Sequence, residues 1–214
     1  MAEPAARALA AMFERMAAAI EARKDELSEL DGAIGDGDHG ITMSLGFKAV
    51  VEALTRLDLE TAQADEVLNT AASAFLDAVG ASTGPLYATG FRRAAQALKG
   101  RGTMDLSAAR DLLAGLSEGV RERGKAQRGD KTMLDVWAPA AEAATASLAA
   151  GEPAAEFWKA VSTAAHAGAA ATATMIAAKG RAARLRERSL GALDPGAVSA
   201  AALVEAMAAA LCRA

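Results

Sequence analysis

The stretch AARALAAMFERMAAAIEARKDELSEL, residues 5–30, carries large apolar side chains at steps of three and four residues. These side chains belong to Leu9, Met12, Phe13, Met16, Ile20, Leu27 and Leu30. A repeat near 3.6 residues places them on one face of an α-helix, and that face needs a core to pack against. The pattern therefore predicts one long helix over 5–30.

The same periodicity continues along most of the chain. Of the 214 residues, 52% are apolar but only 4% are aromatic, and an alanine-rich chain of this kind favours closely packed helices over sheets. We expect further helices at about 40–54, 61–79, 84–98, 105–123, 134–150, 154–179 and 195–212. No serine- or proline-rich linker divides them. The sequence predicts an all-α fold of about eight helices in a single domain, residues 1–214.

Charge and cysteine content exclude several classes of protein. The formal net charge of −4 argues against a sequence-independent nucleic-acid binder, which needs a basic face. The single cysteine, Cys212, excludes an internal disulfide and suits a reducing compartment. Neither the N-terminus nor the alanine-rich run around His166 reaches about 18 uninterrupted apolar residues. We expect a cytoplasmic protein with no nucleic-acid and no membrane partner.

The segment DGAIGDGDHG, residues 31–40, places the carboxylates of Asp31, Asp36 and Asp38 close together in the sequence. Glycine and aspartate are poor helix and strand formers, so we expect a loop here. Two unit charges about 4 Å apart repel by roughly 4 kcal/mol at an effective dielectric of about 20. An ordered loop therefore needs a cation among these carboxylates, whereas a solvated acidic turn needs none.

Oxygen ligands in a glycine-rich turn favour magnesium over calcium. An EF-hand needs a bidentate glutamate at about the twelfth position of its loop, and counting from Asp36 reaches Phe47. Magnesium uses few protein carboxylates and completes its shell with water and phosphate oxygens. His39 follows at the start of the next predicted helix, whose free N–H groups attract anions. Spacing alone leaves a magnesium–polyphosphate site and a solvated turn both open.

Up-and-down packing puts alternate connections between helices at the same end of a bundle. Four such connections, residues 31–40, 79–86, 122–133 and 179–196, hold the unusual chemistry of this sequence, so we expect them to form one site. In the second, Ser82 and Thr83 offer hydroxyls beside small residues, although an ordinary turn looks the same. No P-loop or dinucleotide-binding glycine motif is present. His166, Trp137 and Trp158 are expected in the core.

Four motifs, in this order and spacing, resemble the nucleotide-binding L subunit of dihydroxyacetone kinases, a unit that also forms the C-terminal domain of single-chain ATP-dependent forms. They are DGAIGDGDHGITMSLGF (31–47), GASTGPLYATGF (80–91), GDKTMLDVWAPA (129–140) and ERSLGALDPGAVS (187–199). The resemblance covers essentially the whole chain. It implies a closed barrel of eight antiparallel helices that binds ADP or ATP at one end through two Mg²⁺ ions.

The resemblance also implies roles for single residues. The family's metal-ligating carboxylates correspond to Asp31, Asp36 and Asp38. Its phosphate-binding positions correspond to His39, Gly40, Ile41, Thr42, Ser82 and Thr83. Its positions around the adenine, ribose and phosphates correspond to Gly124, Met133, Arg181, Asp194, Pro195 and Gly196.

This chain departs from the family pattern at four positions. Thr42 stands where asparagine is usual and replaces only part of that amide's hydrogen bonding. Arg184 and Arg186 stand where tyrosine and glycine are usual, and Ala192 stands where histidine is usual. The three aspartates of the acidic motif are intact. The departures therefore concern the expected rim over the nucleotide, where we expect Arg184 and Arg186 to face solvent.

The implied function is a phosphotransferase subunit that acts on a small hydroxyketone held by a partner K subunit. The donor is exchangeable Mg-ATP, or held Mg-ADP that a phosphohistidine carrier subunit recharges, and the sequence does not choose between them. Two alternatives stay open, a regulatory or adaptor protein that binds nucleotide without turnover and a kinase subunit for another ketose such as a tetrulose. A homodimer is a further open assembly. No second polar cluster remains for a carbonyl-binding pocket, so we expect activity to need the K subunit.

Overall fold

The computed structural model describes residues 3–80 and 83–212, and all regular secondary structure in these ranges is helical. The α-helices are α1 (Ala5–Ala22), α2 (Lys24–Ile34), α3 (His39–Leu54), α4 (Ala64–Ala78), α5 (Thr83–Ala97), α6 (Leu106–Gly124), α7 (Leu134–Ala149), α8 (Ala154–Ala171) and α9 (Pro195–Leu211). Two 3₁₀ segments, η1 (Thr172–Thr174) and η2 (Ala182–Ser189), separate α8 from α9. The all-α prediction is confirmed. Within the described ranges, every helix is too short or too polar to cross a membrane.

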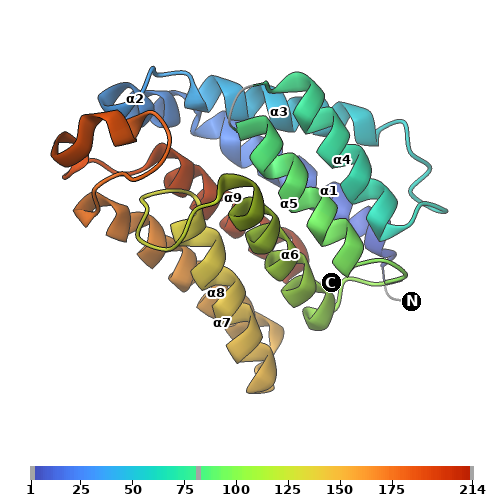
Figure 1. Ribbon diagram of the computed structural model, residues 1–214. Coiled ribbons are helices and arrows are strands. Elements are labelled where there is room, and N and C mark those ends of the chain that lie inside the picture. The colour runs from blue at the N-terminus through green and yellow to red at the C-terminus, as the bar shows by residue number, and fades with distance from the viewer. Residues whose placement is uncertain (1–2, 81–82, 213–214) are drawn as a thin grey trace.

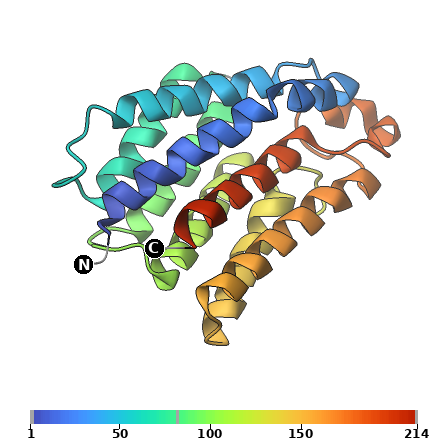
Figure 2. The same ribbon diagram turned by 180° about the vertical axis from the view of Figure 1, so that it is seen from behind.

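The long helices pack against one another in chain order (Figure 1). The exception is α2, since α1 packs directly on α3 while α2 lies beyond their ends near η2. Helix α9 packs against both α8 and α1, and Figure 2 shows these three side by side. The order of neighbours α1, α3, α4, α5, α6, α7, α8, α9 thus leads back to α1. This is the order that up-and-down packing of eight helices requires, and a closed barrel stays a prediction.

Two predicted helix boundaries are wrong, and tertiary packing explains both. The helix expected over 5–30 breaks at Arg23, and α2 continues to Ile34, so Asp31 lies on a helix rather than in a loop. Burial of Leu27 and Ile34 extends α2 despite poor local propensity. The helix expected over 154–179 ends at Ala171, where the hydroxyl of the buried Thr172 donates to the carbonyl of Ala169 at 2.6 Å.

One cluster of buried apolar side chains includes members from all nine α-helices of the described ranges. Its centre is aromatic, with the rings of Phe13 and Phe91 meeting edge to face at 5.3 Å. Trp137 and Trp158 are buried, as predicted. His166 is not, because the core-facing positions of α8 are those of Val161 and Ala165, and His166 points outward to an oxygen of Glu205 at 2.6 Å. The core assignment of His166 is therefore wrong.

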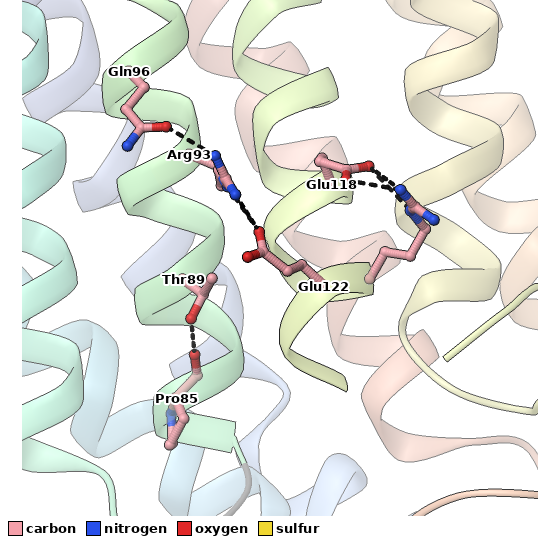
Figure 3. A network of polar contacts seen from close by, with 7 residues as sticks. Pro85, Thr89, Arg93, Gln96, Glu118 and Glu122 are labelled. Atoms are coloured by element: carbon pink, nitrogen blue, oxygen red, sulfur yellow. Dashed lines mark hydrogen bonds and ion pairs between the residues drawn. The ribbon is translucent and has the colours of Figure 1, made fainter. Parts of the chain in front are cut away.

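Helices α5 and α6 lie unusually close, since a Cβ on Gly119 would come within 2.6 Å of the Cα of Gly90. Figure 3 shows the outer face of this pair, where the guanidinium of Arg93 donates to the carboxylate of Glu122 at 2.6 and 2.8 Å. Exposed ion pairs of this kind contribute about 0–1 kcal/mol, so the close backbone contact dominates. It fixes the start of α5 relative to the end of α6, and both belong to the site described next.

Candidate functional site

Four connections meet in one pocket of about 470 Å³ at the end of the molecule near α2 and η2. They are the acidic turn (residues 35–38), the start of α5, the α6–α7 loop (residues 125–133) and the α8–α9 segment (residues 172–194). The walls are completed by Asp31, Ile34, Pro85, Leu86, Val120, Arg123, Ala126, Lys131, Thr132, Lys179 and other residues of these elements. The convergence expected from up-and-down packing is therefore present.

Most of the residues singled out from the sequence lie in this pocket. Its lining includes Asp31, Asp38, His39, Thr83, Gly124, Met133, Arg181, Asp194, Pro195 and Gly196. Asp36 lies in the acidic turn, and Gly40 is buried against α2, where a side chain would overlap the carbonyl of Lys24. Ile41 and Thr42 lie outside the lining, and the side chain of Ile41 is 52% exposed. Ser82 falls outside the described residues.

The carboxylate of Asp31 organises the acidic turn. One of its oxygens, Oδ2, accepts hydrogen bonds from the backbone amides of Asp38 at 3.0 Å and His39 at 3.3 Å. Gly35 passes so close that any side chain there would overlap this carboxylate, and Gly37 adopts a φ of 80° that favours glycine. The glycines of the motif therefore bring the chain back over Asp31, and Asp31 caps the start of α3.

The three carboxylates form a compact cluster. Asp31, Asp36 and Asp38 each offer an oxygen within 4.8 Å of the others. Partial burial, and next the charge of Asp36, raise the pKa of Asp38. The guanidinium of Arg181 pairs with Asp36, and its Nη1 lies 3.7 Å from an oxygen of Asp38. The cluster thus has the negative charge and the oxygen atoms that bind a cation. In this structure the guanidinium of Arg181, from the α8–α9 segment, supplies a positive charge there.

His39 connects the start of α3 to the start of α9. Its Nε2 lies 2.9 Å from Oγ of Ser199, and that hydroxyl donates to the carbonyl of Gly196 at 3.0 Å. Burial lowers the pKa of His39, so the ring is neutral at pH 7. Because the Ser199 proton is already committed, the network assigns the ring proton to Nε2 and leaves Nδ1 as an acceptor. Ser199 is the last residue of the ERSLGALDPGAVS motif, but it was not among the site residues predicted from the sequence.

The α6–α7 loop is held by the side chains of the GDKTMLD motif. The carboxylate of Asp135 accepts from the amides of Gly129 at 2.5 Å and Thr132 at 2.8 Å, which fixes the start of α7. Lys131, between them, is only 1% exposed, and it lines the pocket together with Thr132. Neither residue was predicted from the sequence, because a lysine in a polar break is typical of a solvated turn.

The α8–α9 segment leaves the helices and returns at one point. There the amide of Asp194 donates to the hydroxyl of Thr172 at 3.0 Å, and the amide of Gly191 donates to the carbonyl of Ala173 at 2.8 Å. The outer part of the segment carries Arg184 and Arg186, both exposed, as predicted for a solvent-facing rim. The segment is thus a long loop whose two ends are joined by these two hydrogen bonds. We call this junction, formed by Thr172, Ala173, Gly191 and Asp194, the neck of the segment.

Asp194 caps α9, since its carboxylate accepts from the amide of Ala197 at 2.8 Å. Burial in the pocket wall raises the pKa of Asp194 to about 7, although the Ala197 bond and the ammonium of Lys131 act in the opposite direction. The charges of Asp135 and Asp31 add to the increase. The pocket therefore holds a carboxyl group that changes protonation near neutral pH.

The fold and the pocket define a class of protein. It is an all-helical protein with a pocket at one end of its helices, where a cluster of aspartates faces an arginine. The DAK2 domain profile matches residues 33–209. The chain is 40% identical over 186 residues to the PEP-dependent dihydroxyacetone kinase, ADP-binding subunit DhaL, of Escherichia coli, which covers 85% of this chain and 86% of that protein. It is 37% identical over 188 residues to the Listeria innocua PEP-dependent dihydroxyacetone kinase 2, ADP-binding subunit DhaL, covering 88% and 87%. The chain belongs to the DAK2 domain family.

A solved structure supports the same assignment. The chain superposes on dihydroxyacetone kinase from C. freundii in complex with AMP-PNP and Mg²⁺, with a TM-score of 0.73 and 27% identity. The match covers 98% of this chain but only 35% of that enzyme. The fold is therefore that of one part of a larger kinase chain.

Proposed function

We propose that this chain is the nucleotide-binding subunit of a dihydroxyacetone kinase. The observation that carries the proposal is the cluster of Asp31, Asp36 and Asp38, of which Asp31 and Asp38 line the pocket where the four connections meet. Membership of the DAK2 domain family and 37–40% identity to ADP-binding subunits support it. The ligand is Mg-ADP or Mg-ATP, and the acceptor is a small hydroxyketone.

The residues present fit a divalent cation. Three carboxylates with oxygens within 4.8 Å of one another are a hard-ligand set of the kind that magnesium prefers. We assign Asp31, Asp36 and Asp38 as its ligands and propose two Mg²⁺ ions, which would neutralise charge on the transferred phosphate. Arg181 now pairs with Asp36, so it is placed to turn to the phosphates instead.

The chain's own groups then hold the nucleotide. Among the described residues, the amides of Gly40 and Ile41 at the first turn of α3 have no hydrogen-bond acceptor, which suits a phosphate at a helix N-terminus. We assign His39, Thr42, Ser82 and Thr83 to the same phosphate region. The proposed nucleoside contacts are Gly124, Met133, Arg181, Asp194, Pro195 and Gly196, from the other walls of the pocket.

The hydroxyketone is proposed to be held by a partner K subunit. The second histidine of this chain, His166, is exposed on α8 and paired with Glu205, away from the pocket lining. Exposed apolar side chains on α3 and the α8–α9 segment suit a partner near the pocket mouth, and they belong to Ile41, Leu45, Ile176 and Leu190. A cytoplasmic location and a homodimer stay predictions.

The relatives' names describe ADP-binding subunits of PEP-dependent kinases, which favours held ADP recharged by a phosphohistidine carrier over exchangeable ATP. A nucleotide-exchange assay distinguishes the two, because free exchange of labelled ADP contradicts the carrier version.

The proposed function is tested by a coupled kinase assay on the purified chain, with and without a matching K subunit. We expect Mg-nucleotide binding by the chain alone and phosphorylation of dihydroxyacetone only in the mixture. Turnover by the chain alone, at rates near the roughly 1–100 s⁻¹ typical of kinases, contradicts the need for a partner. Nucleotide binding without turnover in any mixture would instead indicate the regulatory alternative.

A further inference from the structure

Lys131 is an unusual residue for its position. Within residues 3–80 and 83–212 it is the only lysine or arginine that is buried, at 1% exposure. Its backbone adopts a φ of 60°, a left-handed conformation that L residues rarely take. Burying a cation and holding a left-handed backbone both oppose folding, so the contacts of this side chain must offset them.

The ammonium of Lys131 joins two distant carbonyl groups. Its Nζ donates to the backbone oxygens of Thr172 at 2.6 Å and Ala192 at 2.5 Å. These oxygens lie at opposite ends of the α8–α9 segment, at the same neck that the Asp194–Thr172 and Gly191–Ala173 bonds close. Hydrogen bonds from a charged donor are roughly twice as strong as neutral ones. Lys131 is therefore the charged clamp of this neck.

The neck determines where the rest of the segment can reach. Beyond it, residues 179–182 line the pocket, and Arg181 crosses to the acidic cluster and pairs with Asp36. Asp194, at the end of the segment just before α9, lines the same pocket and lies close enough to Lys131 for their charges to attract. An opening of the neck would move Arg181 and Asp194 together.

We propose that Lys131 is a positioning residue for the nucleotide pocket: by clamping the carbonyls of Thr172 and Ala192, it holds Arg181 and Asp194 in the pocket wall. The clamp itself stands on geometry alone, and its effect on the nucleotide rests on the proposed function. The two parts are tested separately.

The clamp is tested by limited trypsin digestion. The part of the α8–α9 segment beyond the neck carries five cleavage sites, at Lys179, Arg181, Arg184, Arg186 and Arg188. In Lys131→Met, cleavage within 179–188 should accelerate by at least about tenfold, because loss of charged hydrogen bonds in a buried neck makes local opening more frequent. The matched control is Lys125→Met. Lys125 lies in the same loop with a φ of 47°, but it is exposed, and cleavage should stay within about twofold of wild type.

A Lys131→Met protein that keeps its helicity and is cleaved at the wild-type rate overturns the proposal. If this variant does not fold, Lys131→Gly replaces it, because glycine suits the left-handed backbone while removing the ammonium. Failure of both variants to fold would also overturn the proposal, since a clamp on one connection is not required by the helical core.

The positioning role is tested by calorimetry with Mg-ADP and by electron paramagnetic resonance with Mn²⁺ alone. Lys131→Met should lower the affinity for Mg-ADP at least about tenfold without lowering the affinity for Mn²⁺, since the acidic turn is built independently of the clamp. Lys131→Arg, which keeps the charge, should recover part of the loss. Unchanged Mg-ADP affinity in Lys131→Met, or an equal loss of Mn²⁺ affinity, contradicts positioning. No Mg-ADP binding by the wild type contradicts the proposed function and leaves the digestion result to decide the clamp.

Discussion

The acidic and the basic wall of the pocket are built in different ways. The acidic wall is local, since the amides of Asp38 and His39 bond to Asp31, seven and eight residues earlier. The basic wall is the α8–α9 segment, and its neck depends on Lys131, which lies 41 and 61 residues from its two acceptors. One wall therefore folds with its own motif, and the other forms only when separate parts of the chain have packed.

The two walls also respond differently to the loss of their charges. Repulsion within the acidic cluster is relieved by Arg181 or by a metal ion, so removing one carboxylate there affects the ligand more than the fold. On the basic side, the buried groups at the neck serve the backbone of the segment itself. Changes in the first wall should appear in activity with the fold unchanged. Changes in the second should appear in nucleotide affinity and also in stability and its pH dependence.

The largest effect is expected in the acidic wall. Replacing Asp36 or Asp38 with asparagine removes a proposed charged metal ligand, and such a contact is worth several kcal/mol in the transition state. Phosphotransfer, assayed with the K subunit present, should fall by at least about 10³-fold, with helicity by circular dichroism unchanged. Glu29→Gln, an exposed carboxylate on α2, is the control and should keep full activity. Near-normal activity of either aspartate variant would show that the metal assignment is wrong.

In the basic wall, Asp194 should make the stability of the protein depend on pH, because burial raises the pKa of its carboxyl group. The unfolded carboxyl loses its proton near pH 3.8, whereas burial raises the folded pKa to about 7. Between these values the native state binds more protons than the unfolded state, so this group lowers the free energy of unfolding as pH rises from about 4 to about 7. Asp194→Asn keeps the helix cap but does not titrate. The melting temperature of Asp194→Asn minus that of the wild type should therefore increase from pH 4 to pH 8.

Melting curves of the nucleotide-free proteins across this range check the prediction. A difference between Asp194→Asn and wild type that does not change with pH would mean that Asp194 is ionised in the folded protein throughout.

The smallest effect is expected at the rim of the basic wall. Arg186 has a φ of 51° and a ψ of −126°, and it is exposed, at a position where the family pattern usually has glycine. Arg186→Gly should therefore stabilise the protein by about 1 kcal/mol, because it removes backbone strain of about 1–3 kcal/mol at some cost in chain entropy. Thermal melting measures this, and Arg188→Gly, outside the left-handed positions, should not stabilise. Equal melting temperatures of Arg186→Gly and wild type would contradict strain at Arg186.

The elements that sequence predicted well depend on neighbours along the chain. Apolar steps of three and four residues predicted the helices, and Asp194 with Pro195 predicted the start of α9 at the right residue. The acidic cluster followed from three aspartates among glycines, since that turn is closed by residues at most eight positions apart. Up-and-down packing then predicted which four connections would meet.

By itself, the sequence determined the all-α class, the acidic turn and the end of the bundle that carries the site, because helix periodicity and short-range turns are local properties. Only the tertiary structure decided that Asp31 lies on α2, that His166 is exposed, and that His39 meets Ser199 across 160 residues. It also showed that Lys131, which the sequence places in a polar loop, is buried and donates to the carbonyls of Thr172 and Ala192. Each of these depends on which helix face meets which partner, and that is determined when the whole core packs.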